Sequence, residues 1–111
     1  MHLSQHPVVD WPAEFDHMIK GAQIAHGREG HRYCRIDLDV DRDTLHRLNE
    51  FEAHARHRCV RLKPADSAEC LLGEMNPLVG LGEPSDPTRH IGKVRVSFHD
   101  LREDDGATVH G

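Results

Sequence analysis

Apolar and polar residues alternate without interruption from Cys34 to Asp41. In a β-strand, successive side chains point to opposite faces, so a period of two separates the residues into two sets. The pattern therefore predicts a strand over residues 33–41 with one face in the core and an acidic face in water. The apolar set is Cys34, Ile36, Leu38 and Val40, and the polar set is Arg35, Asp37, Asp39 and Asp41.

The hydrophobic period changes after this strand. Four apolar residues recur at near-helical spacing, namely Leu45, Leu48, Phe51 and Ala55. This spacing predicts a helix over residues 43–55. Asp41 or Asp43 can cap its start, because a short carboxylate side chain accepts hydrogen bonds from the free N–H groups there.

Three further segments fit strands, at residues 18–26, 59–63 and 93–98. Gly27 and Gly30 stand between the first of these and the acidic strand, which predicts a hairpin. Residues 66–69 match a capping box and predict a short helix over residues 67–75. Prolines and glycines from residue 77 onward predict an irregular connection to residue 91.

The expected fold class is α+β, a small antiparallel sheet in the order β-β-α-β-loop-β with one main helix packed on one face. Residues 17–101 form a single domain in this interpretation, with a long Gly- and Pro-containing loop at 64–91. Residues 1–16 form an extended arm that Trp11 packs onto the domain. Residues 102–111 form a flexible acidic tail.

Composition narrows the classes of protein. The 111 residues are 37% hydrophobic and 30% charged, which excludes a collagen-like rod and a membrane-spanning chain. The formal net charge of −5 excludes a constitutively basic nucleic-acid-packaging protein. Eleven histidines would turn this charge positive if all were protonated, but they are spread along the chain.

Cysteine usage and the N-terminal sequence favour a cytoplasmic protein without a membrane segment. The three cysteines, Cys34, Cys59 and Cys70, are an odd number without C-x-x-C spacing, so we expect reduced and mostly buried thiols. Residues 1–7 lack the basic start and apolar run of a secretory signal.

The acidic row of Asp37, Asp39 and Asp41 is the first candidate site. Calcium binding in an EF-hand loop is disfavoured because Thr44 stands where the tight turn needs glycine. Carboxylates held in a row create a local negative field, so this face can bind a basic protein partner. The alternative is that the row pairs across the sheet with basic neighbours.

An apolar segment within the predicted loop is the second candidate. Met75, Leu78 and Leu81 are its principal residues. They either fold back over the small core or remain exposed as a surface for a protein partner or a second copy of the chain.

Two alternatives involve metal or nucleic acid. His54, His57 and Cys59 carry ligand atoms that zinc prefers, although no recognised spacing completes a set of four. Arg61, Lys63, Lys93 and Arg95 would share a face if their strands were neighbours, and that face could contact phosphates. The scarcity of aromatic residues counts against base stacking. The cofactor prediction is therefore none, with zinc as the alternative.

No arrangement of nucleophile, base and orienting group is present in the sequence, so we predict a protein without enzymatic activity. The run from Ile19 to Pro64 resembles small β-β-α-β accessory proteins of bacteriophages and other mobile elements. That resemblance implies binding to a host or phage protein, in some cases to inhibit a defence complex as an anti-CRISPR does. The leading hypothesis is a protein-interaction module, and the alternative is a zinc-binding or nucleic-acid-associated accessory module.

Overall fold

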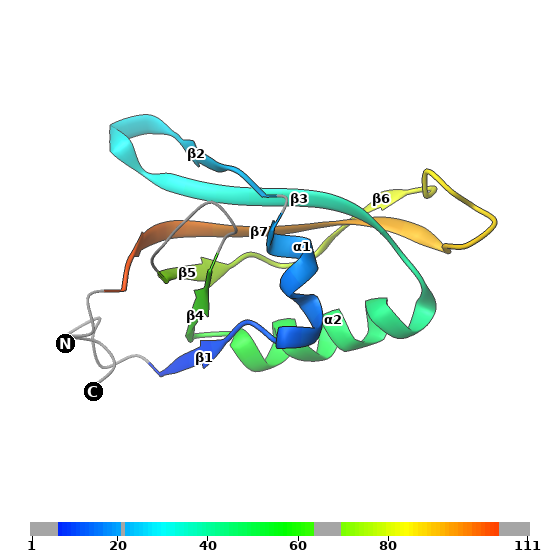
Figure 1. Ribbon diagram of the computed structural model, residues 1–111, viewed down its shortest axis with the longest axis horizontal. Helices are drawn as coiled ribbons and strands as arrows, with labels where there is room; N and C mark the ends of the chain where they lie inside the picture. The colour runs from blue at the N-terminus through cyan, green and yellow to red at the C-terminus, as the bar shows by residue number, and fades with distance from the viewer. Residues whose placement is uncertain (1–6, 21, 64–69, 105–111) are drawn as a thin grey trace.

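The computed structural model describes residues 7–20, 22–63 and 70–104 and shows a small α+β domain (Figure 1). Two α-helices, two single turns of 3₁₀-helix and seven strands make up the described part. The helices are α1 (Asp16–Lys20) and α2 (Arg42–Ala55), and the 3₁₀ turns are η2 (Ala13–Phe15) and η3 (Arg28–Gly30). The strands are β1 (Val8–Asp10), β2 (Ile24–His26), β3 (Arg32–Val40), β4 (Cys59–Leu62), β5 (Leu71–Met75), β6 (Val79–Gly82) and β7 (Gly92–Glu103).

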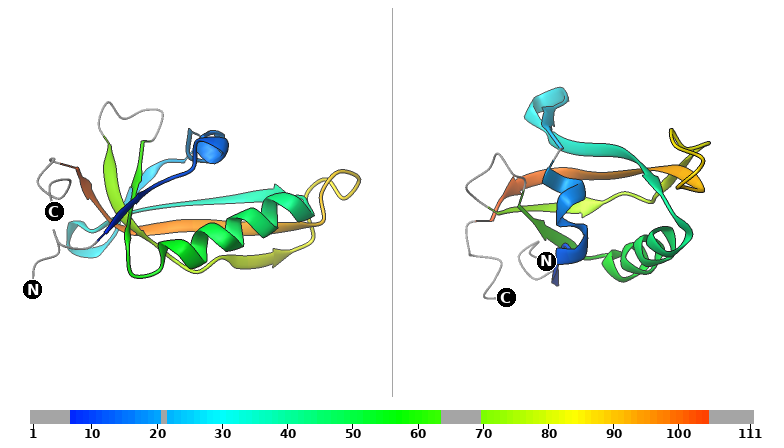
Figure 2. Two further views of the ribbon diagram at one scale, coloured as in Figure 1. Left: turned by 90° about the horizontal axis from the view of Figure 1, so that it is seen from below. Right: turned by 45° about the vertical axis from the view of Figure 1, so that its right-hand side comes forward.

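The strands form one mixed sheet in the order β1-β4-β5-β7-β3-β2. Only the β1–β4 pair is parallel among the described pairs, so the prediction of an antiparallel sheet is right for the rest and wrong at this margin. β5 and β6 lie one after the other along the same edge of β7. β7 is thus the central strand, and β6 lies at the margin of the sheet (Figure 2).

The core lies between the sheet and the two helices (Figures 1 and 2). Trp11 is 6% exposed and its ring meets Phe15, Phe51 and Phe98 at centroid distances of 5.7, 5.3 and 5.4 Å. These contacts join η2, α2 and β7 through one side chain. The prediction that Trp11 packs the N-terminal arm onto the domain is confirmed.

The elements with a clear hydrophobic period lie where they were predicted. β3 buries Cys34 and Val40 and exposes Arg35 and Asp37, as alternation requires. α2 begins after Asp41, whose side chain accepts a hydrogen bond of 2.7 Å from the Thr44 backbone N–H. β2 and β3 form the hairpin expected from the glycines between them.

The predicted strand at 18–26 is wrong over its first half. Asp16–Lys20 is helix α1, and only Ile24–His26 is strand. The reason lies in the spacing of Phe15, Met18, Ile19 and Ala22, all buried. Intervals of three and four residues place them on one side of a helix.

The connection between β4 and β7 is also more regular than predicted. Leu71–Met75 is a strand, not part of a helix, and the capping box at 66–69 lies outside the described residues. Pairing with β4 and β7 stabilises this segment in an extended form. β6 then pairs with β7 within the stretch expected to be irregular.

Both predicted ends take part in the sheet. Val8–Asp10 of the arm pairs with β4, and Arg102 and Glu103 of the predicted tail belong to β7. Asp104 binds Arg61, so its side chain is only 8% exposed. No helix among residues 7–20, 22–63 and 70–104 has the length and hydrophobicity needed to cross a membrane.

Candidate functional site

The carboxylates on the acidic face of β3 bind other groups of the same chain. The Arg95 guanidinium of β7 donates two hydrogen bonds to Asp37, of 2.7 and 3.0 Å. These bonds lower the pKa of the Asp37 carboxyl and raise that of Arg95. The predicted alternative of cross-strand pairing is therefore confirmed for this pair.

Asp39 and Asp41 also bind groups of the same chain. Asp39 accepts hydrogen bonds from the Ser85 and Asp86 backbone N–H groups, of 2.9 and 3.1 Å, and these lower its pKa. It thereby anchors the loop before β7. The Thr44 N–H at the start of α2 lowers the pKa of Asp41 in the same way.

The strands that carry the four basic residues are not neighbours. β5 lies between β4 and β7, so the strand of Arg61 is not next to that of Lys93 and Arg95. Arg61 binds Asp104 at 2.8 Å and Asp10 at 3.0 Å, and the bond to Asp104 is the main reason that its pKa is raised. Lys63 is exposed beyond the end of β4. The condition for a common phosphate-binding face is not met.

The proposed zinc ligands His54, His57 and Cys59 are not brought together into a metal-sized group. His54 and His57 are exposed at the end of α2, whereas Cys59 is 4% exposed. The Cys59 Sγ lies 3.2 Å from a guanidinium nitrogen of Arg102, which donates to it. All three cysteines are free thiols and two are buried, as expected.

The apolar segment from Met75 to Leu81 divides between core and surface. Met75 and Leu78 pack against the core, and Leu81 is half-buried. Val79, which belongs to the same apolar segment, is 46% exposed on β6. β6 pairs with β7 along one edge, and its other edge faces no strand of the described sheet.

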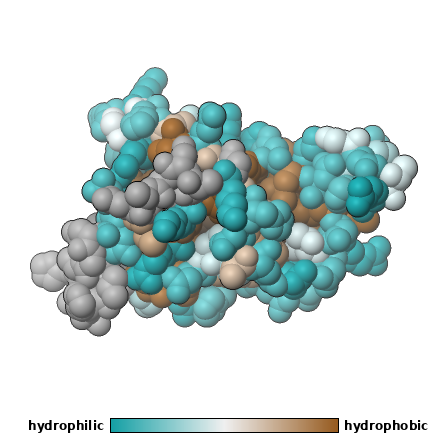
Figure 3. Space-filling view, in the orientation of Figure 1, coloured by the Kyte–Doolittle hydropathy of each residue, from teal (hydrophilic) through white to brown (hydrophobic). Residues whose placement is uncertain are grey.

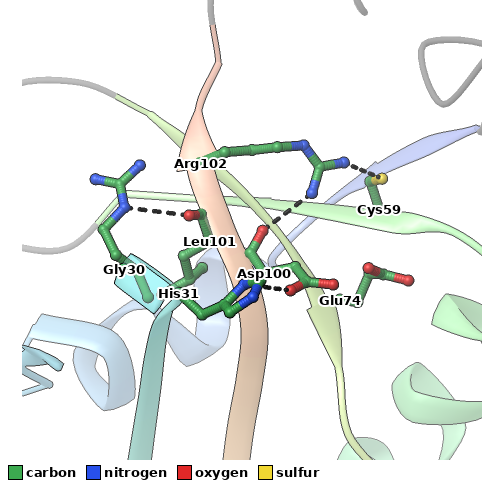
Figure 4. A pocket seen from close by; sticks show the side chains of 8 residues that line it. Gly30, His31, Cys59, Glu74, Asp100, Leu101 and Arg102 are labelled. Atoms are coloured by element: carbon green, nitrogen blue, oxygen red, sulfur yellow. Dashed lines mark hydrogen bonds and ion pairs between the residues drawn. The ribbon is translucent and has the colours of Figure 1, made fainter. Parts of the chain in front are cut away.

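Two adjoining hollows lie at the opposite end of β7. Their volumes are about 380 and 360 Å³, and His31, Arg32 and Asp100 line both. Glu74 lines the first hollow and His99 the second. In Figure 4 the Asp100 carboxylate lies between the His31 ring and Glu74.

Glu74, His99 and Asp100 form the metal-sized group that the described residues contain, with donor atoms all within 4.8 Å of one another. The His99 Nε2 lies 3.9 Å from a Glu74 oxygen and 4.0 Å from an Asp100 oxygen. His31 Nδ1 lies 3.7 Å from the other Asp100 oxygen. Two histidines are thus interleaved with two carboxylates.

The sequence interpretation missed this cluster. The local sign of the cluster in the sequence is that His99 and Asp100 are adjacent. In a regular strand, however, these two side chains would point to opposite faces, so adjacency alone does not predict a shared site. Glu74 and His31 come close only through the pairing of β5 and β3 with β7. Counting histidines along the chain therefore could not reveal their proximity in space.

The chain matches no protein-family model, no curated protein and no solved structure. Two regions stand out, the free edge of β6 and the cluster around His99.

Proposed function

We propose that the protein is an interaction module that receives an extended segment of a partner protein along the free edge of β6. The observation that carries this proposal is that edge, which pairs with no described strand and bears no charged side chain. Backbone N–H and C=O groups along an edge strand can pair with a strand from another chain.

The residues of β6 suit such a contact. Val79 presents an apolar side chain that is 46% exposed, and a Cβ at Gly80 or Gly82 would meet no atom within 4 Å. A partner backbone can therefore approach closely. In the view of Figure 3 the surface is largely hydrophilic, with apolar areas enclosed by hydrophilic residues.

The β1 margin of the sheet is a poorer docking edge. β1 is three residues long, ends in Asp10 and stands between Pro7 and Pro12. Proline cannot donate a backbone hydrogen bond, and a charge disfavours the addition of an apolar strand. The comparison favours β6 for an uncharged, β-branched segment of a partner.

The contact is placed at β6 rather than at Asp37, Asp39 and Asp41, because each of these carboxylates already binds a group of the chain. A protein partner is the role that the resemblance to accessory proteins of mobile elements also implies. Inhibition of a host complex remains part of that proposal. The absence of enzymatic activity is part of it as well.

The test is to place a charge on the edge. Val79→Lys should abolish capture of the partner from native host lysate, because an exposed lysine protects edge strands from pairing. Tyr33→Lys is the matched control, since Tyr33 is 38% exposed on β3, away from this edge. Amide hydrogen exchange of the purified complex should then show protection in residues 79–82.

Three results would overturn the proposal. The first is equal capture by both lysine variants. The second is protection confined to residues outside β6. The third is a wild-type protein that elutes as a dimer and becomes monomeric only with Val79→Lys, which would show that a second copy of the chain occupies the edge.

A further inference from the structure

We propose that Glu74, His99 and Asp100 bind a divalent transition-metal cation such as Zn²⁺, with His31 beside them as a fourth ligand. The inference is independent of the partner proposed for β6. It rests on four observations of the described residues: a strand irregularity, an oriented histidine, the ligand distances and the charge balance of the cluster.

The strand irregularity brings the ligands to one face. Leu72 pairs with Arg102 and Glu74 pairs with His99, so β7 carries one more residue than β5 over this stretch. The extra residue allows Asp100, with φ of 54°, to leave the regular alternation. Its carboxylate then lies beside His99, and Leu101 returns to the core at 4% exposure.

A hydrogen-bond chain orients the His99 ring. The Asn76 amide donates through Nδ2 to the Ser97 Oγ at 2.9 Å, so its Oδ1 faces the His99 Nδ1 at 2.6 Å. This network assigns the His99 proton to Nδ1 and leaves a lone pair on Nε2. Histidines that bind metals are commonly held in this way, by donating the other ring N–H to an oxygen.

The distances leave room for an ion. A proton on Nε2 would make charge-assisted hydrogen bonds of about 2.7–2.9 Å, yet the carboxylate oxygens lie at 3.9 and 4.0 Å. Ligands about 2.0–2.1 Å from a tetrahedral Zn²⁺ are about 3.3 Å apart. Small side-chain rotations would therefore close the three donors on an ion.

The charge balance also favours a cation. The ion-pair contacts of the Glu74 and Asp100 carboxylates in the described residues come from His31 and His99. The two neighbouring arginines bind elsewhere: Arg32 donates to the Leu101 carbonyl, and Arg102 to the Asp100 carbonyl and Cys59. With neutral histidines, two carboxylates share the site without a strong counter-charge.

The donor set indicates the class of ion. Imidazole suits zinc and carboxylates suit harder divalent ions, so Zn²⁺ and Mn²⁺ fit better than Cu⁺, which prefers sulfur. The hollows on either side leave the site open to solvent. A bound ion would keep at least one coordination position for water or for a ligand atom.

The test is calorimetric titration of the untagged chain with Zn²⁺. The wild type should bind one ion, and His99→Ala should weaken binding by about 100-fold or more, since it removes a ligand. The control is the double variant His54→Ala and His57→Ala, which removes two exposed histidines outside the cluster and should leave the affinity unchanged. Thermal unfolding of each variant in chelator checks that it folds.

A second variant tests the orientation of the ring. Asn76→Ala should weaken Zn²⁺ binding by about 10-fold, within the range seen for partners of metal-bound histidines. Nitrogen NMR of the imidazole rings should show the Nδ1–H form of His99 before titration and metal at Nε2 after it. The same titration with Mn²⁺ should broaden the signals of residues 74, 99 and 100 first.

The inference is overturned if the wild type binds no Zn²⁺, or if His99→Ala binds it as tightly as the wild type. It is also overturned if only the variant lacking His54 and His57 loses binding. These results leave the proposal for the edge of β6 untouched. That proposal is tested by Val79→Lys, which leaves all the proposed metal ligands in place.

Discussion

The two halves of β7 follow different rules. From Gly92 to Phe98 the strand is regular in its pairing with β3, with Val94, Val96 and Phe98 in the core and Arg95 paired with Asp37 on the other face. From His99 to Glu103 the strand carries an extra residue, and its neighbour across the sheet is β5. The first half holds the core of the sheet together, and the second half brings His99 and Asp100 beside Glu74.

The difference shows how a single extra residue rearranges the side chains of a strand. One extra residue at Asp100 changes which side chains share a face, while Leu101 keeps the core filled. Sheets use such bulges to redirect side chains near functional sites. Three pairs of variants test whether the two halves differ in this way.

The largest effect is expected at Gly73 of β5, opposite the bulged half. A Cβ there would lie 2.5 Å from the Leu101 Cδ2 and 3.3 Å from the His99 carbonyl oxygen. Gly73→Ala should therefore lower the free energy of unfolding by roughly 1–3 kcal/mol, because Leu101 must move within a packed core. Urea unfolding followed by Trp11 fluorescence measures this change.

Gly80→Ala is the matched control on β6, the strand that pairs with the first half of β7. A Cβ there meets no atom within 4 Å, so the substitution should leave stability unchanged or raise it by up to about 1 kcal/mol. Equal losses for Gly73→Ala and Gly80→Ala would mean that the packing at the bulge is not special.

A smaller effect is expected from the backbone of Asp100. Asp100→Gly and Asp100→Ala both remove the carboxylate, but only glycine adopts a φ of 54° without steric cost. The glycine variant should be the more stable by about 1 kcal/mol. Indistinguishable melting curves would indicate that the bulge rearranges and that its conformation is not fixed by its neighbours.

The smallest effect is expected at Asp37 in the regular half, and it depends on pH. Hydrogen bonds from Arg95 lower the pKa of Asp37 in the folded state, so this carboxylate stabilises the fold above its unfolded pKa of about 3.9. The stabilisation is lost as the pH falls through the lower, folded-state value.

Asp37→Asn should therefore be less stable than the wild type at pH 7, and the difference should shrink as the pH falls below about 4. Thermal melts at pH 7 and pH 2.5 measure it, with Glu103→Gln in the other half as the control. A difference that is the same at both pH values would show that the loss comes from side-chain shape and not from charge.

The predictability of the fold follows the same division. β3, α2 and the first half of β7 have a clear hydrophobic period, and all three were predicted from it. α1 was missed because it is only five residues long and contains few apolar residues. β5 was missed because partners distant in sequence stabilise it, whereas a capping box is local.

The candidate site was harder to predict than the fold. The acidic row was recognised, but hydrogen bonding to Arg95, Ser85 and Thr44 depends on the register of strands and loops. The cluster around His99 depends on a bulge, and no composition or spacing rule predicts the position of an extra residue. The histidines that come together in the structure are accordingly not the ones that lie closest in the sequence.

The position of Trp11 has a consequence for how the chain folds. It is the one tryptophan of the protein, and it packs on Phe51 and on Phe98, which lie far along the chain. Its burial therefore requires the helix and the central strand to be in place, and contacts between such distant residues form slowly. The fluorescence of Trp11 should report the last step of assembly, in which the sheet closes at the β1 margin.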